Sequence, residues 1–280
     1  MPQVNREGLG PVKLTVVTPT RNAADYLEAC IHSVLANRSD DVVVKHLIVD
    51  SGSVDETLEI AARMDVKILH VDPINIHHSI NEGNRAALES DVVGLLGGDD
   101  IMPPGTARFV ADWYRSRRSS WLVGGAEWID VSGKSLGKVN PPPRWLTPQV
   151  YASLGWSWIS PQSTFITPEF VEEVGYFDTS FEYSGDFEYF TRALGKRRFD
   201  RTSRTLSLNR IHPDQHSKIP DPVRLVEVNR VENMYAPDSR VIRWLYRYLL
   251  KLRVNIASPA WFYNKRVSGL LAHRSSRVHR

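Results

Sequence analysis

Two adjacent carboxylates, Asp99 and Asp100, directly follow an apolar run and two glycines within residues 92–104. The apolar run predicts a buried strand up to Leu96, where the chain must leave it. Neighbouring carboxylates at the end of a buried strand repel each other and are costly to desolvate, and a divalent cation relieves both costs. A solvated Asp-Asp turn before a proline-started helix is the alternative, because Asp and Gly favour turns.

Two further groups of residues could take part in chemistry. Asp186 and Glu188 lie at the start of a predicted helix, where either could act as a general base. Acidic residues are common in a first helical turn because the helix dipole favours negative charge there, so a purely structural role stands beside the functional one. Farther along, His212 and His216 flank Asp214, and one of these histidines could bind a metal, although a surface histidine is the commoner case.

The first hundred residues supply the elements that would position these groups. Apolar runs predict strands over 13–19, 42–49, 66–71 and 92–96. Helical spacing between them predicts helices over 25–36, from a capping box at 53–56 to about residue 64, and over 80–89. Such alternation predicts a parallel sheet with crossover helices.

Polar residues follow three of these strands, at the edge of the sheet where ligands bind. We therefore expect them to converge on one crevice, although any one of them alone is more simply a turn. They are Thr18, Pro19, Thr20, Arg21 and Asn22; Asp50, Ser51, Gly52 and Ser53; and Gly98, Asp99 and Asp100.

After residue 104 the pattern changes. A helix over 105–114 is followed by a predicted hairpin of strands 121–129 and 135–139. The aromatic stretch 156–165 contains Trp158 and Gln162, and its rings either belong to the core or line a sugar site by stacking on C–H surfaces.

Composition narrows the class of protein. The chain has 35 Lys and Arg against 32 Asp and Glu, a near balance that argues against a nucleic-acid binder. The glycine patterns of dinucleotide-binding and P-loop folds are absent. Cys30 is the single cysteine, residues 1–11 show no secretory signal, and no apolar run approaches the ~20 residues of a membrane span, so we expect a cytoplasmic protein.

The last part of the chain has a distinct charge. From Ser239 onward it carries Lys and Arg but no Asp or Glu. The pattern after Asp238 predicts a basic amphipathic helix, and residues 261–271 continue its aromatic and basic character. Such a segment either binds an anionic membrane surface, which would place the protein peripherally on the inner face of the membrane, or packs on the domain with a solvated basic face.

The motifs taken together resemble those of family 2 glycosyltransferases of GT-A fold, in particular the bacterial enzymes of polysaccharide and cell-envelope biosynthesis. The resemblance covers residues 13–217 and rests on the order of five motifs: Val17-Thr18-Pro19-Thr20-Arg21-Asn22, Ile48-Val49-Asp50-Ser51-Gly52-Ser53-Val54-Asp55-Glu56-Thr57, Ile80-Asn81-Glu82-Gly83, Gly94-Leu95-Leu96-Gly97-Gly98-Asp99-Asp100 and Ser184-Gly185-Asp186-Phe187-Glu188.

The resemblance implies an α/β fold of the GT-A type, Rossmann-like, with a mostly parallel central sheet and helices on both faces. It would occupy residues 1–217, with a nucleotide-binding half at 13–104 and an acceptor or catalytic half at 105–217. Residues 218–280 would form a helical, basic and aromatic extension.

The resemblance also assigns roles. Asp186 would be the catalytic base, and Asp99 with His216 would bind Mn²⁺ or Mg²⁺, with His212 as the rival ligand. The acceptor-side candidates are Trp158, Gln162 and Glu188. The residues that would bind the donor are Thr18, Pro19, Thr20, Asn22, Asp50, Ser51, Ser53, Asn81, Gly83, Asp99 and Asp100.

The chain departs from the family pattern at two positions. Gly97 stands where the first Asp of the Asp-x-Asp motif is expected, and Gly185 stands where a Glu precedes the base. The expected activity is inverting transfer from a nucleoside-diphosphate sugar, a UDP-sugar first, to a hydroxyl of a glycan or lipid-linked acceptor. A sugar-phosphate nucleotidyltransferase and a non-catalytic nucleotide-sugar binder are the alternatives.

Overall fold

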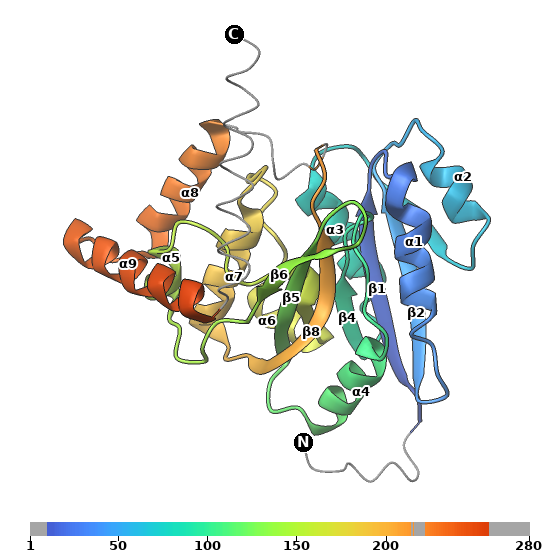
Figure 1. Ribbon diagram of the computed structural model, residues 1–280, viewed down its shortest axis with the longest axis horizontal. Helices are drawn as coiled ribbons and strands as arrows, with labels where there is room; N and C mark the ends of the chain where they lie inside the picture. Colours follow the sequence, from blue (N-terminus) through green and yellow to red (C-terminus); the bar gives the residue numbers. More distant parts are fainter. Residues whose placement is uncertain (1–9, 214, 216–221, 258–280) are drawn as a thin grey trace.

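One mixed sheet forms the centre of the molecule (Figure 1). The computed structural model describes residues 10–213, 215 and 222–257. Within that part the sheet has eight strands in the order β3-β2-β1-β4-β7-β5-β6, with β8 also paired to β5. The strands are β1 Val12–Thr20, β2 Val42–Asp50, β3 Lys67–His70, β4 Val92–Leu95, β5 Trp121–Ile129, β6 Ser135–Val139, β7 Thr164–Ile166 and β8 Asp200–Arg210.

The two halves of the sheet differ in strand direction. Strands β1 to β4 run parallel, as the alternating sequence pattern predicts. Beyond β4, the short strand β7 pairs antiparallel with both β4 and β5, and β5 in turn pairs antiparallel with β6 and parallel with β8. The sheet is therefore continuous across the expected boundary at residue 104, and the division of the chain into domains stays a prediction.

Helices cover both faces of the sheet. Buried side chains of α1, α2 and α4 pack on one face, and those of α3, α6 and α7 pack on the other. The helices are α1 Ala24–Leu35, α2 Thr57–Ala62, α3 Ile76–Ala86, α4 Thr106–Ser116, α5 Pro148–Ala152, α6 Pro168–Val174, α7 Gly185–Lys196, α8 Pro222–Tyr235 and α9 Arg240–Ala257, with a 3₁₀ turn at Pro161–Ser163. This arrangement confirms the expected fold class.

The predicted capping box at residues 53–56 is wrong. Helix α2 begins at Thr57, whose backbone N–H donates to Asp55 Oδ1 at 3.1 Å. Ser53 instead donates its hydroxyl to Asp50, because the loop after β2 folds back onto that carboxylate. Helix α3 also starts earlier than predicted, at Ile76, since the side chain of Asn75 caps it.

Helices α8 and α9 pack against the body of the molecule. They contact α5 and α7, at the end of the molecule farthest from α1 and α2 (Figure 1). Over the described residues, none of the helices combines the length and the apolar character that crossing a membrane requires. Residues 261–271, the second predicted basic stretch, lie outside the described residues.

We predict that Gly94→Ala destabilises the protein through Phe165. The two residues are paired across β4 and β7, and a Cβ at Gly94 would lie 2.6 Å from Phe165 Cε1. Overpacking of this kind typically costs about 1–3 kcal/mol in urea unfolding. In a Phe165→Leu background the same substitution should cost less, whereas Gly10→Ala, which enters open space, should be neutral. Equal costs in both backgrounds would contradict this prediction.

Candidate functional site

Two adjoining cavities lie beyond the carboxyl ends of β1 and β4. The first, of about 470 Å³, is lined by the loops after β1 and β2 and by the start of α3; we call it the strand-end cavity. The second, of about 370 Å³, is lined by Trp128, Trp156 and Trp158; we call it the aromatic cavity. Both cavities share Pro19, Ile76, Gly98, Asp99, Glu182 and Gln215.

The loops after β1 and β2 hold each other in place. Asn22 adopts a left-handed backbone with φ of 53°, which Asn tolerates better than most residues. Its side-chain Oδ1 accepts the N–H of Val54 at 2.9 Å, and its own N–H donates to Ser53 Oγ at 2.9 Å. These bonds fix the wall of the strand-end cavity, which Thr20, Asn22 and Ser51 line.

Asp50 is occupied within its own loop. Its carboxylate accepts the N–H groups of Gly52 and Ser53, both at 3.0 Å, and the hydroxyl of Thr20 at 3.3 Å. The side chain is 1% exposed and lines neither cavity. In the structure, Asp50 and Ser53 therefore shape the loop that presents Ser51.

Asp99 faces both cavities and contacts His212. The distance from Asp99 Oδ2 to His212 Nε2 is 3.0 Å, and the carboxylate is 29% exposed. Asp100 differs sharply: it is buried, and its Oδ1 accepts the backbone N–H of Arg210 at 2.8 Å. Burial, with the neighbouring charge of Asp99, raises the pKa of Asp100 well above its usual value. Asp100 lines only the aromatic cavity, whereas Asp99 lines both cavities and is the more exposed of the two carboxylates.

The glycine at position 97 has a steric explanation. A Cβ there would lie 2.6 Å from Asp99 Oδ1 and 2.7 Å from Asp100 Oδ2. The two carboxylates fill the space that a side chain at this position would need. The carbonyl of Gly97 also accepts the N–H of Asp100 at 3.1 Å, which closes the turn.

Arg210 is a site residue that the sequence did not single out. It ends β8, and its Nε donates to the Asp99 carbonyl at 3.0 Å. Its guanidinium also lies 5.0 Å from the centre of the Tyr26 ring, which itself lies 5.0 Å from the His212 ring. Its position two residues before His212 is the one signal that could have drawn attention to it.

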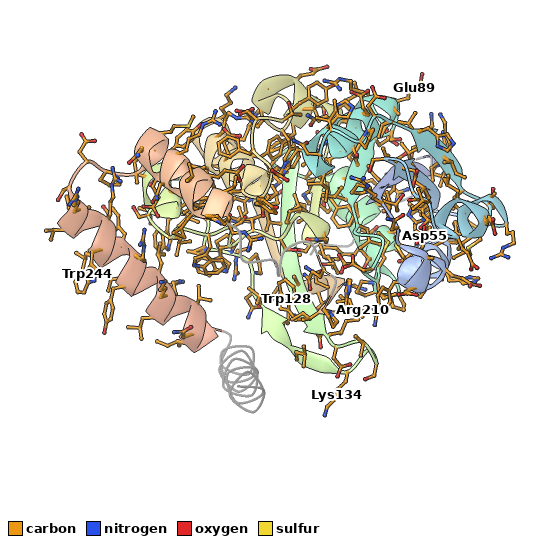
Figure 2. The ribbon with its side chains drawn as sticks, turned by 90° about the horizontal axis from the view of Figure 1, so that it is seen from above. Asp55, Glu89, Trp128, Lys134, Arg210 and Trp244 are labelled. Carbon is orange, nitrogen blue, oxygen red and sulfur yellow. The ribbon has the colours of Figure 1, made fainter. Side chains whose placement is uncertain are left out.

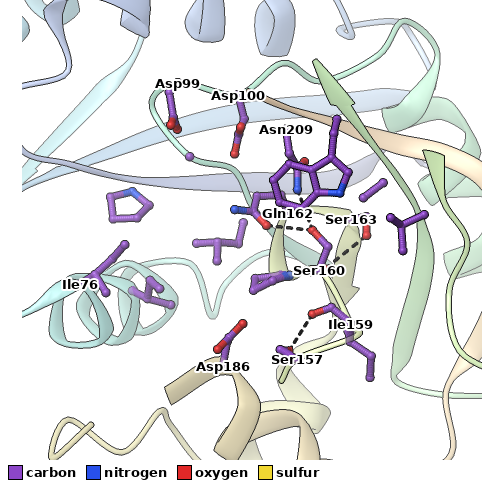
Figure 3. A pocket seen from close by; sticks show the side chains of 18 of the residues that line it. Ile76, Asp99, Asp100, Ser157, Ile159, Ser160, Gln162, Ser163, Asp186 and Asn209 are labelled. Carbon is purple, nitrogen blue, oxygen red and sulfur yellow. Dashed lines mark hydrogen bonds between the residues drawn. The ribbon is translucent and has the colours of Figure 1, made fainter. Parts of the chain in front are cut away.

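Asp186 faces the aromatic cavity from the first turn of α7, across from Asp99 and Asp100 and beside Ser157 (Figure 3). Its Oδ1 accepts the N–H of Phe187 at 2.7 Å. Burial raises the pKa of Asp186 to about 6, despite the opposing effect of hydrogen bonds from Phe187 and Ser157. A carboxylate with such a pKa is suited to accepting a proton near neutral pH.

His77 explains the second departure from the family pattern. A Cβ at Gly185 would lie 2.5 Å from His77 Nε2, so the imidazole occupies the space of the expected Glu side chain. His77 lines the aromatic cavity, and its Nδ1 donates to the Phe181 carbonyl at 2.9 Å.

The structure brings most, but not all, of the predicted site residues together. Pro19, Trp158 and Gln162 line a cavity. Glu188 does not, because it is buried in an ion pair with Arg192 at 2.8 Å. Among the residues predicted to bind the donor, three are buried outside both cavities, where they take part in packing or in structural hydrogen bonds: Thr18, Asn81 and Gly83.

The predicted metal ligands are Asp99 and His216. His216 lies outside the described residues, and His212 is the histidine that contacts Asp99. Within residues 10–213, 215 and 222–257, no group of three His, Cys, Asp or Glu side chains is arranged to hold a metal ion. A carboxylate and an imidazole beside an open cavity still fit Mn²⁺ or Mg²⁺ when a ligand's oxygens complete the coordination.

Helix α8 reaches the loop that leads to Asp186. The carboxylate of Glu227 accepts three consecutive backbone N–H groups, those of Glu182 at 2.5 Å, Tyr183 at 3.0 Å and Ser184 at 2.8 Å. Glu227 is 6% exposed, so this interaction is screened little by water. Sequence reasoning missed Glu227 because the partners lie more than forty residues apart.

Comparison with known proteins places this geometry in context. A family model described as "Glycosyl transferase family 2" matches residues 15–170. An uncharacterized glycosyltransferase of Mycoplasma genitalium is 37% identical over 120 residues, which cover 40% of this chain and 40% of that protein. The chain therefore aligns with less than half of that relative's length.

Two solved structures share the fold. TarS of S. aureus, residues 1–349 in complex with UDP-GlcNAc, superposes with a TM-score of 0.62 at 18% identity, covering 84% of this chain and 70% of that one. GalNAc-T7 with UDP, GalNAc and Mn²⁺ superposes with a TM-score of 0.56 at 18% identity, covering 80% and 48%.

We predict that Glu227→Gln loosens the loop before Asp186. The amide would offer one acceptor oxygen where the carboxylate offers two, and it would place N–H groups against backbone donors. Hydrogen exchange of the Glu182, Tyr183 and Ser184 amides should rise by about tenfold, which corresponds to ~1.4 kcal/mol.

The matched control is Glu232→Gln, also on α8 and nearly buried, whose ion-pair partner is Arg247 on α9. It should lower the melting temperature without changing exchange at those three amides. Equal exchange at these amides in both variants would show that Glu227 does not hold the loop.

Proposed function

Because the chain belongs to glycosyl transferase family 2, we propose that it transfers a sugar from a nucleoside-diphosphate sugar to a hydroxyl group. One observation carries the proposal: the strand-end cavity and the aromatic cavity meet at Asp99, and Asp186 lies on the far side of the second. In this proposal the first cavity is the donor site, the second is the acceptor site, and the base lies in the wall of the acceptor site opposite Asp99.

The strand-end cavity is the proposed donor site. Its volume of about 470 Å³ lies within the range of ~300–1,000 Å³ that is usual for small-molecule sites. Thr20, Asn22 and Ser51 offer hydroxyl, amide and backbone groups along its wall. A UDP-sugar is the preferred donor, since the two structures of the same fold were solved with UDP-GlcNAc and with UDP.

Asp99 and His212 are the proposed ligands of Mn²⁺ or Mg²⁺. When bound, such an ion would act as a Lewis acid toward the departing diphosphate. The chain itself positions both side chains. Arg210 donates a hydrogen bond to the Asp99 carbonyl, and His212 lies two residues after Arg210 in the sequence. His216 remains an alternative ligand from the sequence.

Asp186 is the proposed general base. It would accept the proton of the acceptor hydroxyl while that oxygen attacks the anomeric carbon and the bond to the diphosphate breaks. A single displacement of this kind inverts the configuration at the anomeric carbon. Because its pKa is raised to about 6, Asp186 is largely ionised at neutral pH and still has enough affinity for a proton to accept one.

The aromatic cavity is the proposed acceptor site. Trp128, Trp156 and Trp158 line it, and indole faces suit the C–H surfaces of sugar rings. Gln162 offers an amide in the same wall. We propose a glycan or lipid-linked acceptor in cell-envelope polysaccharide synthesis, at the cytoplasmic side of a membrane.

The product released distinguishes this proposal from the two alternative functions. A sugar-phosphate nucleotidyltransferase would release pyrophosphate instead of a nucleoside diphosphate, and a non-catalytic nucleotide-sugar binder would release neither.

We predict that Asp186→Asn lowers transfer by about 10²–10⁴-fold, the usual contribution of a general base. Binding of the donor, measured by the shift in melting temperature with UDP, should survive. Glu188→Gln serves as the control for a rival base: it should reduce stability, because it breaks the ion pair with Arg192, but keep turnover within a few-fold. Near-normal turnover by Asp186→Asn would eliminate Asp186 as the base.

The same carboxyl predicts a pH dependence. Because the ionised form is the base, kcat/KM should rise as the pH increases through about 6. The pKa of Asp186 in the folded protein lies above the usual value of an aspartate, so folding favours the protonated form, and this stabilisation is lost as the pH rises through about 6. Asp186→Asn should therefore melt above the wild type at pH 8 and close to it at pH 4. The opposite order at pH 8 would contradict the assignment.

We predict that His212→Ala weakens the binding of UDP in the presence of Mn²⁺ by about tenfold, or ~1.4 kcal/mol. Isothermal titration with and without EDTA measures the metal-dependent part. His32→Ala, at an exposed histidine of α1, is the control and should leave both affinities unchanged. If His212→Ala bound UDP and Mn²⁺ like the wild type, His212 would not be a ligand.

A further inference from the structure

Helix α9 carries an exposed apolar stripe. Its largest exposed fractions are 74% for Val241, 64% for Trp244, 56% for Tyr248 and 71% for Ile256. At 100° per residue these positions, together with Leu245, Leu249 and Leu252, lie within an arc of about 140° of the helix circumference. Figure 2 shows Trp244 on the side of α9 directed away from the body of the molecule.

The opposite side of α9 fixes this orientation. Leu250 and Val254 are 3% and 2% exposed and belong to the main hydrophobic core. Arg247 donates to the Ser153 carbonyl at 3.0 Å and pairs with Glu232 on α8. The stripe therefore faces outward because the helix is anchored by its other side.

Positive charge borders the stripe. On the helical wheel, Arg240 and Lys251 lie along one edge and Arg253 along the other. Helix α9 contains no Asp or Glu. A stripe of aliphatic and aromatic residues between cationic edges is the pattern of helices that lie in a membrane interface.

Two arginines outside α9, Arg144 and Arg201, extend this surface beside Arg253. The guanidinium of Arg253 lies 5.8 Å from the centre of the Trp145 ring, and Trp145 is 53% exposed. The pKa of Arg201 is lowered by burial and by the charges of Arg253 and Arg144, so each of these two cations lies close enough to repel Arg201. Asp200 is the neighbouring acid, 3.6 Å from Arg144, and it already accepts the Trp113 N–H at 2.9 Å.

We propose that α9, Trp145 and the cluster of Arg144, Arg201 and Arg253 form one surface that docks on an anionic phospholipid bilayer. The rings and aliphatic side chains would enter the headgroup boundary, while the guanidinium groups would bind lipid phosphates and relieve their mutual repulsion. Aromatic residues of this amphipathic kind are enriched at that depth of a membrane.

Charge disfavours the other possible occupants. A second copy of the same face would bring two cationic surfaces together. Residues 258–280 of this chain also contain Lys and Arg but no Asp or Glu, so they could not neutralise the cluster. An anionic partner is the one that matches the described surface.

The surface adjoins the proposed acceptor site. Arg247 of α9 bonds Ser153, directly after α5, and the chain then continues to Trp156 and Trp158 in the wall of the aromatic cavity. Docking would hold that cavity near a membrane, which suits a lipid-linked acceptor. This last step rests on the proposed function, whereas the docking itself does not.

Co-sedimentation of the full chain with vesicles tests the proposal without any sugar transfer. The wild type should bind vesicles of equal parts phosphatidylcholine and phosphatidylglycerol at least about tenfold more tightly than phosphatidylcholine alone. Both Trp244→Ser/Tyr248→Ser and Arg144→Gln/Arg253→Gln should reduce that binding by about tenfold or more, with melting temperatures near that of the wild type, because the Arg144 side chain is 61% exposed.

Matched controls are available on other surfaces. Leu225→Ser/Val226→Ser removes two exposed aliphatic side chains from α8, and Arg63→Gln/Lys67→Gln removes two exposed charges near α2 and β3. Both controls should bind vesicles like the wild type, and every variant should turn over a water-soluble acceptor like the wild type.

Three results would overturn the proposal. The first is vesicle binding by the wild type that is absent or independent of phosphatidylglycerol. The second is unchanged vesicle binding by both double variants of the docking surface. The third is a wild-type dimer, detected by light scattering, that Trp244→Ser/Tyr248→Ser converts to a monomer. The last result would identify the surface as an interface between copies. A chain that binds vesicles but transfers no sugar would contradict the proposed function and leave the docking surface standing.

Discussion

The site depends on how the structure accommodates two neighbouring carboxylates at the end of a buried strand. Asp99 and Asp100 cannot both be solvated there, and their repulsion is relieved unequally. Asp100 is buried against the backbone N–H of Arg210, whereas Asp99 stays accessible beside His212. Arg210 is the last residue of β8 and His212 follows it by two residues, so both partners lie more than a hundred residues away in the chain.

The pairing of β8 makes this possible. The backbone N–H of Ile101 donates to Leu208 at 3.0 Å, and the N–H of Leu208 donates back to Ile101 at 2.9 Å. These bonds hold the loop that carries Asp99 and Asp100 against β8. They thereby place Arg210 and His212 within hydrogen-bonding distance of that loop. The parallel half of the sheet, β1 to β4, is thereby joined to the half that contains β8. The position of Asp186 likewise depends on a residue distant in the sequence, because Glu227 of α8 accepts hydrogen bonds from the loop that precedes Asp186.

The sequence predicted those parts of the fold that local pattern determines. Apolar runs located the four parallel strands, and the hairpin of β5 and β6 spans the predicted residues. Strand β7 was missed because three residues leave no periodic signal. The capping box at Ser53 failed because the N–H of Asn22 donates to the Ser53 hydroxyl oxygen and the Asp50 carboxylate accepts the Ser53 N–H, so both groups of the expected box have other partners.

The candidate site divides along the same line. The polar residues after β1 and β4 were predictable, because parallel strands end at one edge of the sheet. The glycines at 97 and 185 could be noticed but not explained, since the atoms that fill their space are the Asp99 and Asp100 carboxylates and the His77 ring. Arg210 and Glu227 act through contacts distant in sequence, which no spacing rule reveals.

The central claim is that Asp99 binds the metal ion that holds the diphosphate, whereas Asp186, the proposed base, does not bind the metal. Electron paramagnetic resonance of free Mn²⁺, titrated with protein in the presence of UDP, tests it most directly. The account predicts that the wild type and Asp186→Asn deplete the free Mn²⁺ signal equally and that Asp99→Asn leaves most of it. Depletion by Asp99→Asn equal to that by the wild type would contradict the account.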